Sequence, residues 1–254
     1  MGKKAIILSM SCNQGRYINE ENIIRRTWGK DVLEGKYDNI ELLFYRGGSD
    51  STYLENNIIH IDEKDDLNGT YHKSLKAFRY IDDNFEYDYI IRCNTSNYIN
   101  IEAINNFLDF DSIDDETMFG ASLLINGVNN WIPFLRGNFL IIPKKIINIL
   151  INNNIGLSCG IDDFCFGYVL QRHYRDEYLK HILEIDTIDN INESYYEQLC
   201  NSYCVRLRDV ENIENIPLLM IGLHFIYKNI KTQINPPHGF TKIYTIYGKI
   251  PIDV

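Results

Sequence analysis

Several features that would assign a protein to a class at once are missing from this sequence. No run of about 18 apolar residues occurs in the 254 residues, so no membrane-spanning helix is expected. Basic residues are outnumbered, 25 against 35 acidic ones, which gives a formal net charge of -10. A chain this acidic repels nucleic acid and anionic membrane surfaces, so we expect neither a nucleic-acid partner nor an integral membrane segment.

Short motifs for common cofactor and hydrolase sites are missing as well. Gly47 and Gly48 lack the spacing of a dinucleotide-binding glycine loop, and no nucleophile-elbow pattern occurs. The six cysteines form no Cys-x-x-Cys pair, and Cys200 and Cys204 lack the partner ligands of a zinc site. We interpret the cysteines as mostly buried thiols in a reducing compartment. The apolar run from Ala5 to Met10 is too short for a signal peptide, so we expect a cytoplasmic protein.

The hydrophobic content of 45% and aromatic content of 13% are typical of a globular protein. Apolar periodicity predicts strands at 4–10, 39–45, 57–61, 117–125 and 139–142 and helices at 17–28, 68–83, 101–108, 143–151 and 162–174. Residues 218–227 and 242–252 are predicted as strands. The helix that starts at Asn68 or Thr70 has one of these residues as its cap, and Trp28 is expected in the core. This alternation favours one α/β domain over residues 1–254, with a Rossmann-like mixed but mostly parallel central sheet and helices on both faces.

The stretch from Tyr87 to Asn100 is the most informative part of the chain. Its apolar, β-branched centre around Ile90 stops abruptly at the small polar residues Asn94, Thr95 and Ser96. This pattern predicts a buried strand that delivers polar side chains to the edge of a sheet, where α/β proteins bind ligands.

Five segments, taken in order, resemble one enzyme family. Ile24–Gly29 resembles an Ile-Arg-x-Thr-Trp signature, Asp65–Ser74 a segment ending in Lys-Thr, and Tyr89–Asn100 a strand followed by Asp-Asp-Asp. Trp131–Phe139 resembles an acceptor-side segment, and Asp162–Gly167 resembles Glu-Asp-Val-Tyr-Val-Gly. Together they are similar to glycosyltransferase family 31, the β-1,3-galactosyltransferases and N-acetylglucosaminyltransferases.

The resemblance implies a GT-A fold and transfer of a hexose, such as galactose or N-acetylglucosamine, from a UDP-sugar. The acceptor would be a glycan or glycoconjugate hydroxyl, and the anomeric configuration would invert. It makes Asp163 the catalytic base, with Asp162 beside it, although two acids at a helix start also suit simple capping. The acceptor-binding residues that it implies are Trp131, Arg136, Gly137 and Asn138.

The resemblance fails at the acidic residues with which the family binds its metal ion. Asn94-Thr95-Ser96 stands where the family has three acids, and neutral groups are poor ligands for Mn²⁺ or Mg²⁺. The metal-site candidates are therefore Asn94, Ser96 and a late histidine, His224, while Asp109 and Asp111 form an Asp-x-Asp outside a strand end. His224 equally suits a structural role with a neighbouring partner. Without a metal, the negative charge of the leaving diphosphate would be neutralised by Arg92, Lys73, Arg25 or His224.

The donor-binding residues expected on this basis extend from the end of the first strand to the polar end of the later one. They are Ser9, Asn13, Arg16, Arg25, Lys73, Arg92, Asn94, Thr95 and Ser96. Two further hypotheses remain open beside the enzyme: a degenerate GT-A domain that binds a nucleotide sugar or glycan without catalysis, and a scaffold that keeps only the fold.

Overall fold

The computed structural model describes residues 2–109, 115–120, 123–126, 132–153, 161–173, 179–181, 184–185, 202–207 and 216–230. Within these ranges the main sheet has eight strands in the order β11-β7-β10-β5-β1-β2-β4-β3. The strands are β11 (Leu179–His181), β7 (Met118–Gly120), β10 (Phe139–Pro143), β5 (Tyr89–Asn94), β1 (Ala5–Met10), β2 (Ile40–Arg46), β4 (Ile58–His60) and β3 (Tyr53–Glu55).

The centre of the sheet is parallel. Strand β1 runs parallel to β2 on one side and to β5 on the other, with Met10 opposite both Tyr45 and Asn94. Strands β10 and β3 are antiparallel to their neighbours, so the sheet is mixed. The chain leaves β1 toward β2 and returns on the other side as β5, which makes the ends of β1 and β5 a switch point where ligands bind in open α/β sheets.

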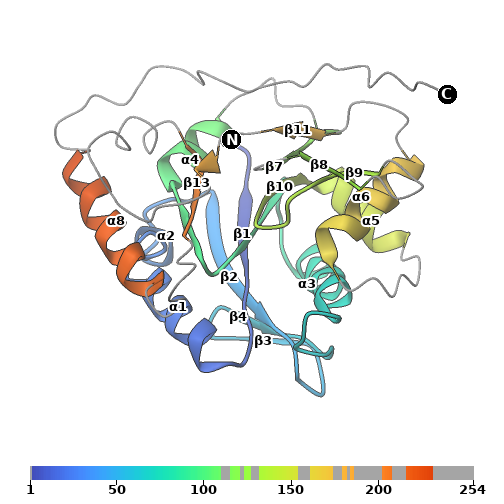
Figure 1. The fold of residues 1–254 in the computed structure, drawn as a ribbon, viewed down its shortest axis with the longest axis horizontal. Coiled ribbons are helices and arrows are strands. Elements are labelled where there is room, and N and C mark those ends of the chain that lie inside the picture. Colours follow the sequence, from blue (N-terminus) through green and yellow to red (C-terminus); the bar gives the residue numbers. More distant parts are fainter. Residues whose placement is uncertain are drawn as a thin grey trace.

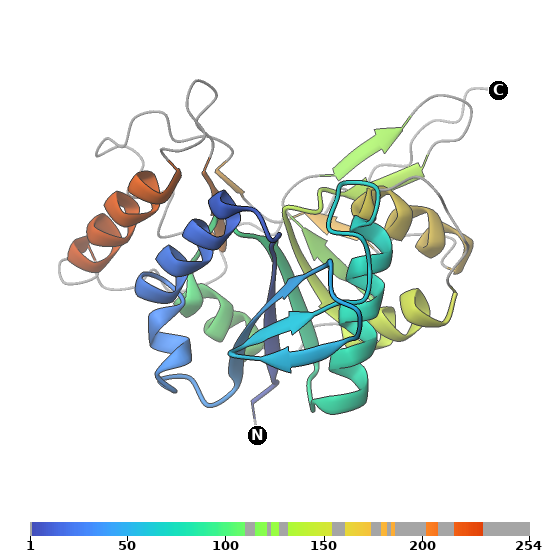
Figure 2. The ribbon, with the colours of Figure 1, turned by 90° about the horizontal axis from the view of Figure 1, so that it is seen from below.

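Helices cover both faces of this sheet (Figures 1 and 2). Helices α1 (Gly15–Arg26), α2 (Lys30–Leu33), α4 (Ile101–Leu108) and α8 (Ile216–Ile230) lie on one face, and α3 (Thr70–Asn84), α5 (Lys144–Asn152) and α6 (Asp162–His173) lie on the other. Ile7 of β1 packs into the first core and Leu8 into the second, because successive strand residues point to opposite faces. The predicted α/β class and mixed, mostly parallel sheet are confirmed.

Two small sheets extend the central one. Strand β6 (Asn97–Ile99) follows β5 after a turn and pairs with β13 (Cys204–Arg206), which also pairs with β12 (Glu184–Ile185). Strands β8 (Leu123–Asn126) and β9 (Ile132–Leu135) form an antiparallel pair beside α6. Strand β6 turns away from the main sheet, so residues 94–96 stay at the edge of the main sheet.

The predicted elements are largely recovered, with informative errors. Residues 218–227 form part of helix α8 and not a strand, because Ile216, Met220 and Leu223 follow a helical spacing and are buried. The predicted strand 117–125 is two strands in different sheets. Strand β3 was not predicted; it pairs with β4 through a turn at Asn56 and Asn57, both with positive φ.

Three further predictions can be compared with the structure. The cap of α3 is Gly69 and has no side-chain hydrogen bond, so neither Asn68 nor Thr70 is the cap. Trp28 is buried, as expected, and its Nε1 donates to the carbonyl oxygen of Asn97 at 3.0 Å. Cys165 is disulfide-bonded, which corrects its interpretation as a thiol. The strand predicted at 242–252 lies outside the described residues, and no described helix has the length and apolar character needed to cross a membrane.

Candidate active site

A cavity of about 460 Å³ lies at the ends of β1 and β5. Its position is the switch point of the sheet, where β1 leads into α1 and β5 leads into the turn before β6. The described residues that line it include Ser11, Cys12, Gln14, Arg16, Tyr17, Glu20, Asp65, Asp66, Thr70, Lys73, Asn94, Thr95, Ser96 and Arg206. The fold therefore brings the loop after β1, the segment before α3 and the polar end of β5 around one space.

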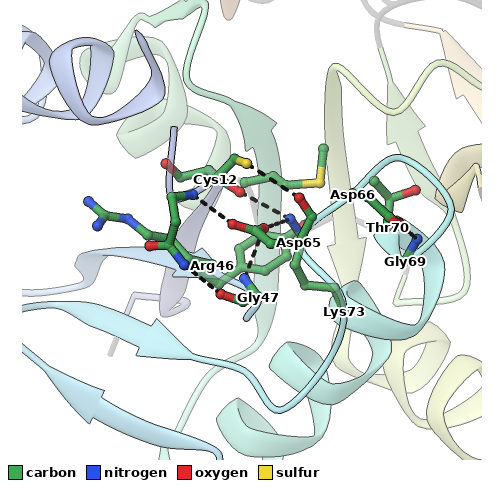
Figure 3. Close-up of polar contacts among 12 residues, drawn as sticks. Cys12, Arg46, Gly47, Asp65, Asp66, Gly69, Thr70 and Lys73 are labelled. Carbon is green, nitrogen blue, oxygen red and sulfur yellow. Dashed lines mark hydrogen bonds and ion pairs between the residues drawn. The ribbon is translucent and has the colours of Figure 1, made fainter. Parts of the chain in front are cut away.

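Asp65 fixes one wall of the cavity (Figure 3). Its carboxylate accepts hydrogen bonds from the backbone N–H of Asn13 at 2.6 Å and of Gly47 at 3.0 Å, and it pairs with Lys73 Nζ at 2.8 Å. Lys73 Nζ also donates to the carbonyl oxygen of Ser11 at 3.0 Å. Burial alone would raise the pKa of Asp65, but these hydrogen bonds and the Lys73 charge outweigh it and lower the pKa. Asp65 thus joins the ends of β1 and β2 to α3.

Gly47 allows the close approach that this arrangement needs. A Cβ on Gly47 would lie 2.6 Å from the carbonyl oxygen of Glu63 and 2.9 Å from that of Lys64. Both contacts are with backbone atoms, which cannot move aside as a flexible side chain does. The glycine therefore lets the segment before α3 lie directly against the end of β2.

Glu20 is a site residue that the sequence analysis missed. Its side chain lies on α1, is fully buried and lines the cavity. One carboxylate oxygen accepts from Arg16 Nε at 2.9 Å, and the other accepts a short hydrogen bond from the Thr95 hydroxyl. Glu20 therefore ties the first turn of α1 to the loop after β5. The signal available in the sequence is the (i, i+4) pair of Arg16 and Glu20 on a helix that starts just after a buried strand.

A buried ion pair lies beneath the other wall of the cavity. Arg92 of β5 is 1% exposed, and its Nη2 lies 2.7 Å from a carboxylate oxygen of Asp162 at the start of α6. Its Nη1 donates to Asn94 Oδ1 at 2.8 Å, and Asp162 also accepts from Ser74 Oγ at 3.0 Å. Burial alone would lower the pKa of Arg92, but the charge of Asp162 and smaller contributions from Tyr45 and Asp163 together raise it, so Arg92 stays charged. Asp162 is therefore the counter-ion of Arg92.

Asp163 lies beside this pair, at the N-terminus of α6. Its Oδ2 accepts from the backbone N–H of Gly137 at 2.9 Å, and its Oδ1 accepts from that of Phe164 at 2.7 Å. A Cβ on Gly137 would lie 3.0 Å from the Asp163 Cβ, so the turn between β9 and β10 sits tightly against α6. Partial burial, and then the charge of Asp162, raises the pKa of Asp163.

The cavity gathers about half of the donor-site residues predicted from the sequence. Arg16, Lys73, Asn94, Thr95 and Ser96 line it. The other four do not: Ser9 is buried within β1, Arg92 lies beneath Asn94, Asn13 donates through its side chain to the carbonyl oxygen of Gly47, and Arg25 lies over the Phe44 ring. Arg25 also donates to the carbonyl oxygen of Asn56 at 2.9 Å, away from the cavity.

The predicted acceptor residues form a separate group. Gly137 contacts Asp163, Asn138 is buried with its carbonyl oxygen accepting from Asn97 Nδ2 at 2.8 Å, and Arg136 precedes them at the end of β9. Trp131 lies outside the described residues. Of the three described residues, Gly137 lies against the start of α6 and Asn138 against Asn97, and none of the three lines the cavity.

Two of the three metal candidates, Asn94 and Ser96, line the cavity, and His224 is not among its lining residues. Nδ1 of His224, on α8, lies 3.0 Å from the Tyr98 hydroxyl, and His224 does not line the cavity. Burial lowers the pKa of His224. Asp109 ends α4 and approaches Gly2, before the start of β1 and so at the opposite end of that strand from the cavity, while Asp111 lies outside the described residues. Within the described part of the chain no three His, Cys, Asp or Glu side chains gather as a metal site.

Replacing Arg92 by methionine should destabilise the fold strongly. The variant leaves Asp162 buried without its counter-ion, which costs about 3–5 kcal/mol of unfolding free energy. Urea denaturation followed by circular dichroism measures this loss. The matched control is Lys4→Met, which removes an exposed partner of Glu86 and should cost less than about 1 kcal/mol. Equal effects of the two variants would refute the role assigned to Arg92.

Asp65→Asn should lower stability at neutral pH and leave it little changed in acid. A carboxyl with a lowered pKa in the folded protein stabilises the fold above its unfolded pKa, and this contribution is lost as the pH falls through the folded value. The difference in unfolding free energy between wild type and variant should therefore shrink below about pH 4. A difference that is constant from neutral pH into acid would show that the Asp65 charge does not act in this way.

No known protein family and no curated protein matches the sequence. Among solved structures, the chain is similar to a glycosyltransferase involved in the glycosylation of the major capsid of PBCV-1, with 12% identity, a TM-score of 0.52 and coverage of 86% of this chain and 99% of that one. Lower scores relate it to the glycosyltransferase GlyE of Streptococcus pneumoniae TIGR4 (10% identity, TM-score 0.40, coverage 93% and 65%). They also relate it to the galactosyltransferase LgtC in complex with donor and acceptor sugar analogues (12% identity, TM-score 0.43, coverage 86% and 95%). The first similarity and the sheet topology show that the chain has the GT-A fold of glycosyltransferases.

Proposed function

We propose that this protein is an inverting glycosyltransferase that moves a hexose from a UDP-sugar to a hydroxyl of a glycan or glycoconjugate. The observation that carries the proposal is the cavity at the ends of β1 and β5 in a GT-A fold, lined by Asn94, Thr95 and Ser96. In the sequence resemblance these three residues stand at the diphosphate of the donor. Galactose or N-acetylglucosamine as the sugar, and a β-1,3 linkage, rest on the sequence motifs alone.

The cavity suits a nucleoside diphosphate in its chemistry as well as its position. Three basic side chains, Arg16, Lys73 and Arg206, line it. Tyr17 and the polar loop at Gln14 offer an aromatic ring and an amide for the nucleoside. Because Asp65 and Glu20 fix Lys73 and Arg16 in place, these cations lose little side-chain entropy when a ligand binds.

Asp163 is the base in this proposal. Its pKa is raised, which favours proton transfer nearer to neutral pH than for an ordinary aspartate. It would take the proton of the acceptor hydroxyl while that oxygen forms a bond to the anomeric carbon. The bond from this carbon to the diphosphate breaks on the opposite face, and the UDP leaves with the electron pair. The guanidinium of Arg92 contacts both Asp162, the neighbour of Asp163, and Asn94 at the cavity wall. This link supports a donor on the Asn94 side of the ion pair and an acceptor on the Asp163 side.

The second candidate is a domain that binds a nucleotide sugar or glycan without turnover. Two observations favour it: both Asp163 oxygens accept backbone hydrogen bonds, and Asp163 does not line the cavity. A base held in this way must still reach an acceptor hydroxyl within about 3 Å.

Incubation with a panel of UDP-sugars and simple glycoside acceptors separates the two candidates. The enzyme releases UDP faster when an acceptor is present and forms a new glycoside, which mass spectrometry detects. Tight UDP binding by calorimetry, without product from any pair, would support the binder. Absence of both binding and product would contradict the proposed function.

Asp163→Asn should lower turnover by roughly 10²–10⁴-fold, because the variant cannot accept the hydroxyl proton. Donor affinity should change little, since Asp163 lies outside the cavity. The control is Asp83→Asn, the same chemical change at an exposed position in the last turn of α3, which should retain full activity. If Asp163→Asn keeps wild-type turnover, the base lies elsewhere.

A further inference from the structure

We propose that the cavity holds the donor diphosphate with hydrogen-bond donors of the protein and without a divalent cation. The groups are the first-turn N–H groups of α1, the Ser11 hydroxyl and the Asn94 amide. This inference rests on the proposed function, because it names how the same cavity takes its nucleotide donor.

The first argument is the orientation of Asn94. Arg92 has only hydrogen-bond donors, so the Asn94 group that lies 2.8 Å from its Nη1 is the amide oxygen. That oxygen, the atom that could coordinate a metal, therefore already accepts from a cation. The end of Asn94 that remains is the NH₂ group, which donates to anions and cannot bind Mn²⁺ or Mg²⁺. A metal at this position would also lie next to the buried Arg92 charge.

The second argument is the charge balance of the cavity wall. Among the described residues, the acids that line the cavity are Glu20, Asp65 and Asp66. Glu20 is paired with Arg16 and Thr95, and Asp65 with Lys73 and two backbone N–H groups. Asp66 is exposed, and its Oδ1 accepts from the Gly69 N–H at 2.8 Å. A divalent cation prefers several anionic oxygens, and two of these three carboxylates already compensate a protein cation. The residues present do not fit the metal that the GT-A fold implies.

The third argument is the N-terminus of α1. This helix of 12 residues has no acid in its first turn and no side-chain cap. Its first helical hydrogen bond runs from the Ile18 N–H to the Gln14 carbonyl, so the N–H groups of residues 15–17 precede the helical ladder. Gln14, Arg16 and Tyr17 line the cavity. A helix N-terminus carries a partial positive charge and favours phosphate.

The fourth argument is Ser11, at the end of β1. Ser11 is one of the residues that line the cavity, it is 2% exposed, and its hydroxyl has no hydrogen-bond partner among the described residues. A buried polar group without a partner is costly, and buried hydroxyls are normally satisfied. Ser11 lies between β1 and the start of α1, so a phosphate oxygen at that helix would supply the missing acceptor.

These groups would act on the charge that develops as the sugar leaves. The bond between the anomeric carbon and the diphosphate oxygen breaks, and negative charge grows on the UDP. Hydrogen bonds from fixed donors to this charge stabilise it more than they stabilise the bound donor. In metal-dependent enzymes a bound cation has this role.

Ser11→Ala tests the site with inorganic pyrophosphate and UDP, by titration calorimetry in EDTA. The variant should bind both ligands roughly tenfold more weakly, because it loses a hydrogen bond to a charged group. Its melting temperature should not fall, since the hydroxyl has no partner in the free protein. The matched control is Ser9→Ala, two residues earlier in β1, which is equally buried and outside the cavity, and it should bind like wild type. Wild-type affinity in Ser11→Ala would overturn the assignment.

Mn²⁺ provides the second arm of the test. UDP should bind wild type equally well in EDTA and with Mn²⁺, and electron paramagnetic resonance should detect no bound Mn²⁺ on the free protein. Asn94→Asp, which replaces an amide donor by an acceptor, should weaken UDP binding in EDTA by roughly tenfold or more.

Each outcome decides between the inference and the function on which it rests. If UDP binds only with Mn²⁺, the metal-free site is wrong and the proposed function stands. If UDP binds in EDTA but pyrophosphate does not, the diphosphate is not held by these groups and the inference also fails. If neither ligand binds with or without Mn²⁺, both proposals fail.

Discussion

The ion pair between Arg92 and Asp162 is the interaction on which the site depends. It joins the central strand β5 to the start of α6, and the same guanidinium fixes the amide of Asn94 at the sheet edge. A cation this deeply buried is stable only with its counter-ion, so strand, helix and cavity wall cannot be rearranged separately. Through this one contact the position of Asn94 at the cavity wall is tied to the start of α6.

Ion pairs also organise the opposite wall, and there they decide what kind of ligand fits. Asp65 pairs with Lys73 and accepts from the backbone N–H of Gly47, and Glu20 pairs with Arg16. These contacts hold three loops around the cavity. The cavity consequently offers fixed hydrogen-bond donors and little uncompensated negative charge. We propose that a site of this kind selects an anion such as a diphosphate and not a divalent cation.

The sequence predicted the sheet well because buried parallel strands and amphipathic helices leave strong periodic signals, as in β1, β5 and α3. It also located the cavity edge, since Asn94, Thr95 and Ser96 interrupt an apolar strand. It failed at α8, where isoleucine and aromatic residues favoured a strand although Ile216, Met220 and Leu223 pack with a helical period. The role of Glu20 and the partner of Arg92 could not be predicted. Glu20 contacts Thr95, and Arg92 contacts Asp162, only in the folded structure, and residue spacing in the sequence gives no sign of either contact.

A crystal structure of the protein with UDP, grown in the presence of EDTA, tests the central claim most directly. We expect the diphosphate in the cavity at the ends of β1 and β5, with its oxygens within hydrogen-bond distance of Ser11 Oγ, the first N–H groups of α1 and Asn94 Nδ2. UDP bound in another place, or bound only in crystals that contain Mn²⁺ coordinated by the diphosphate, would contradict it.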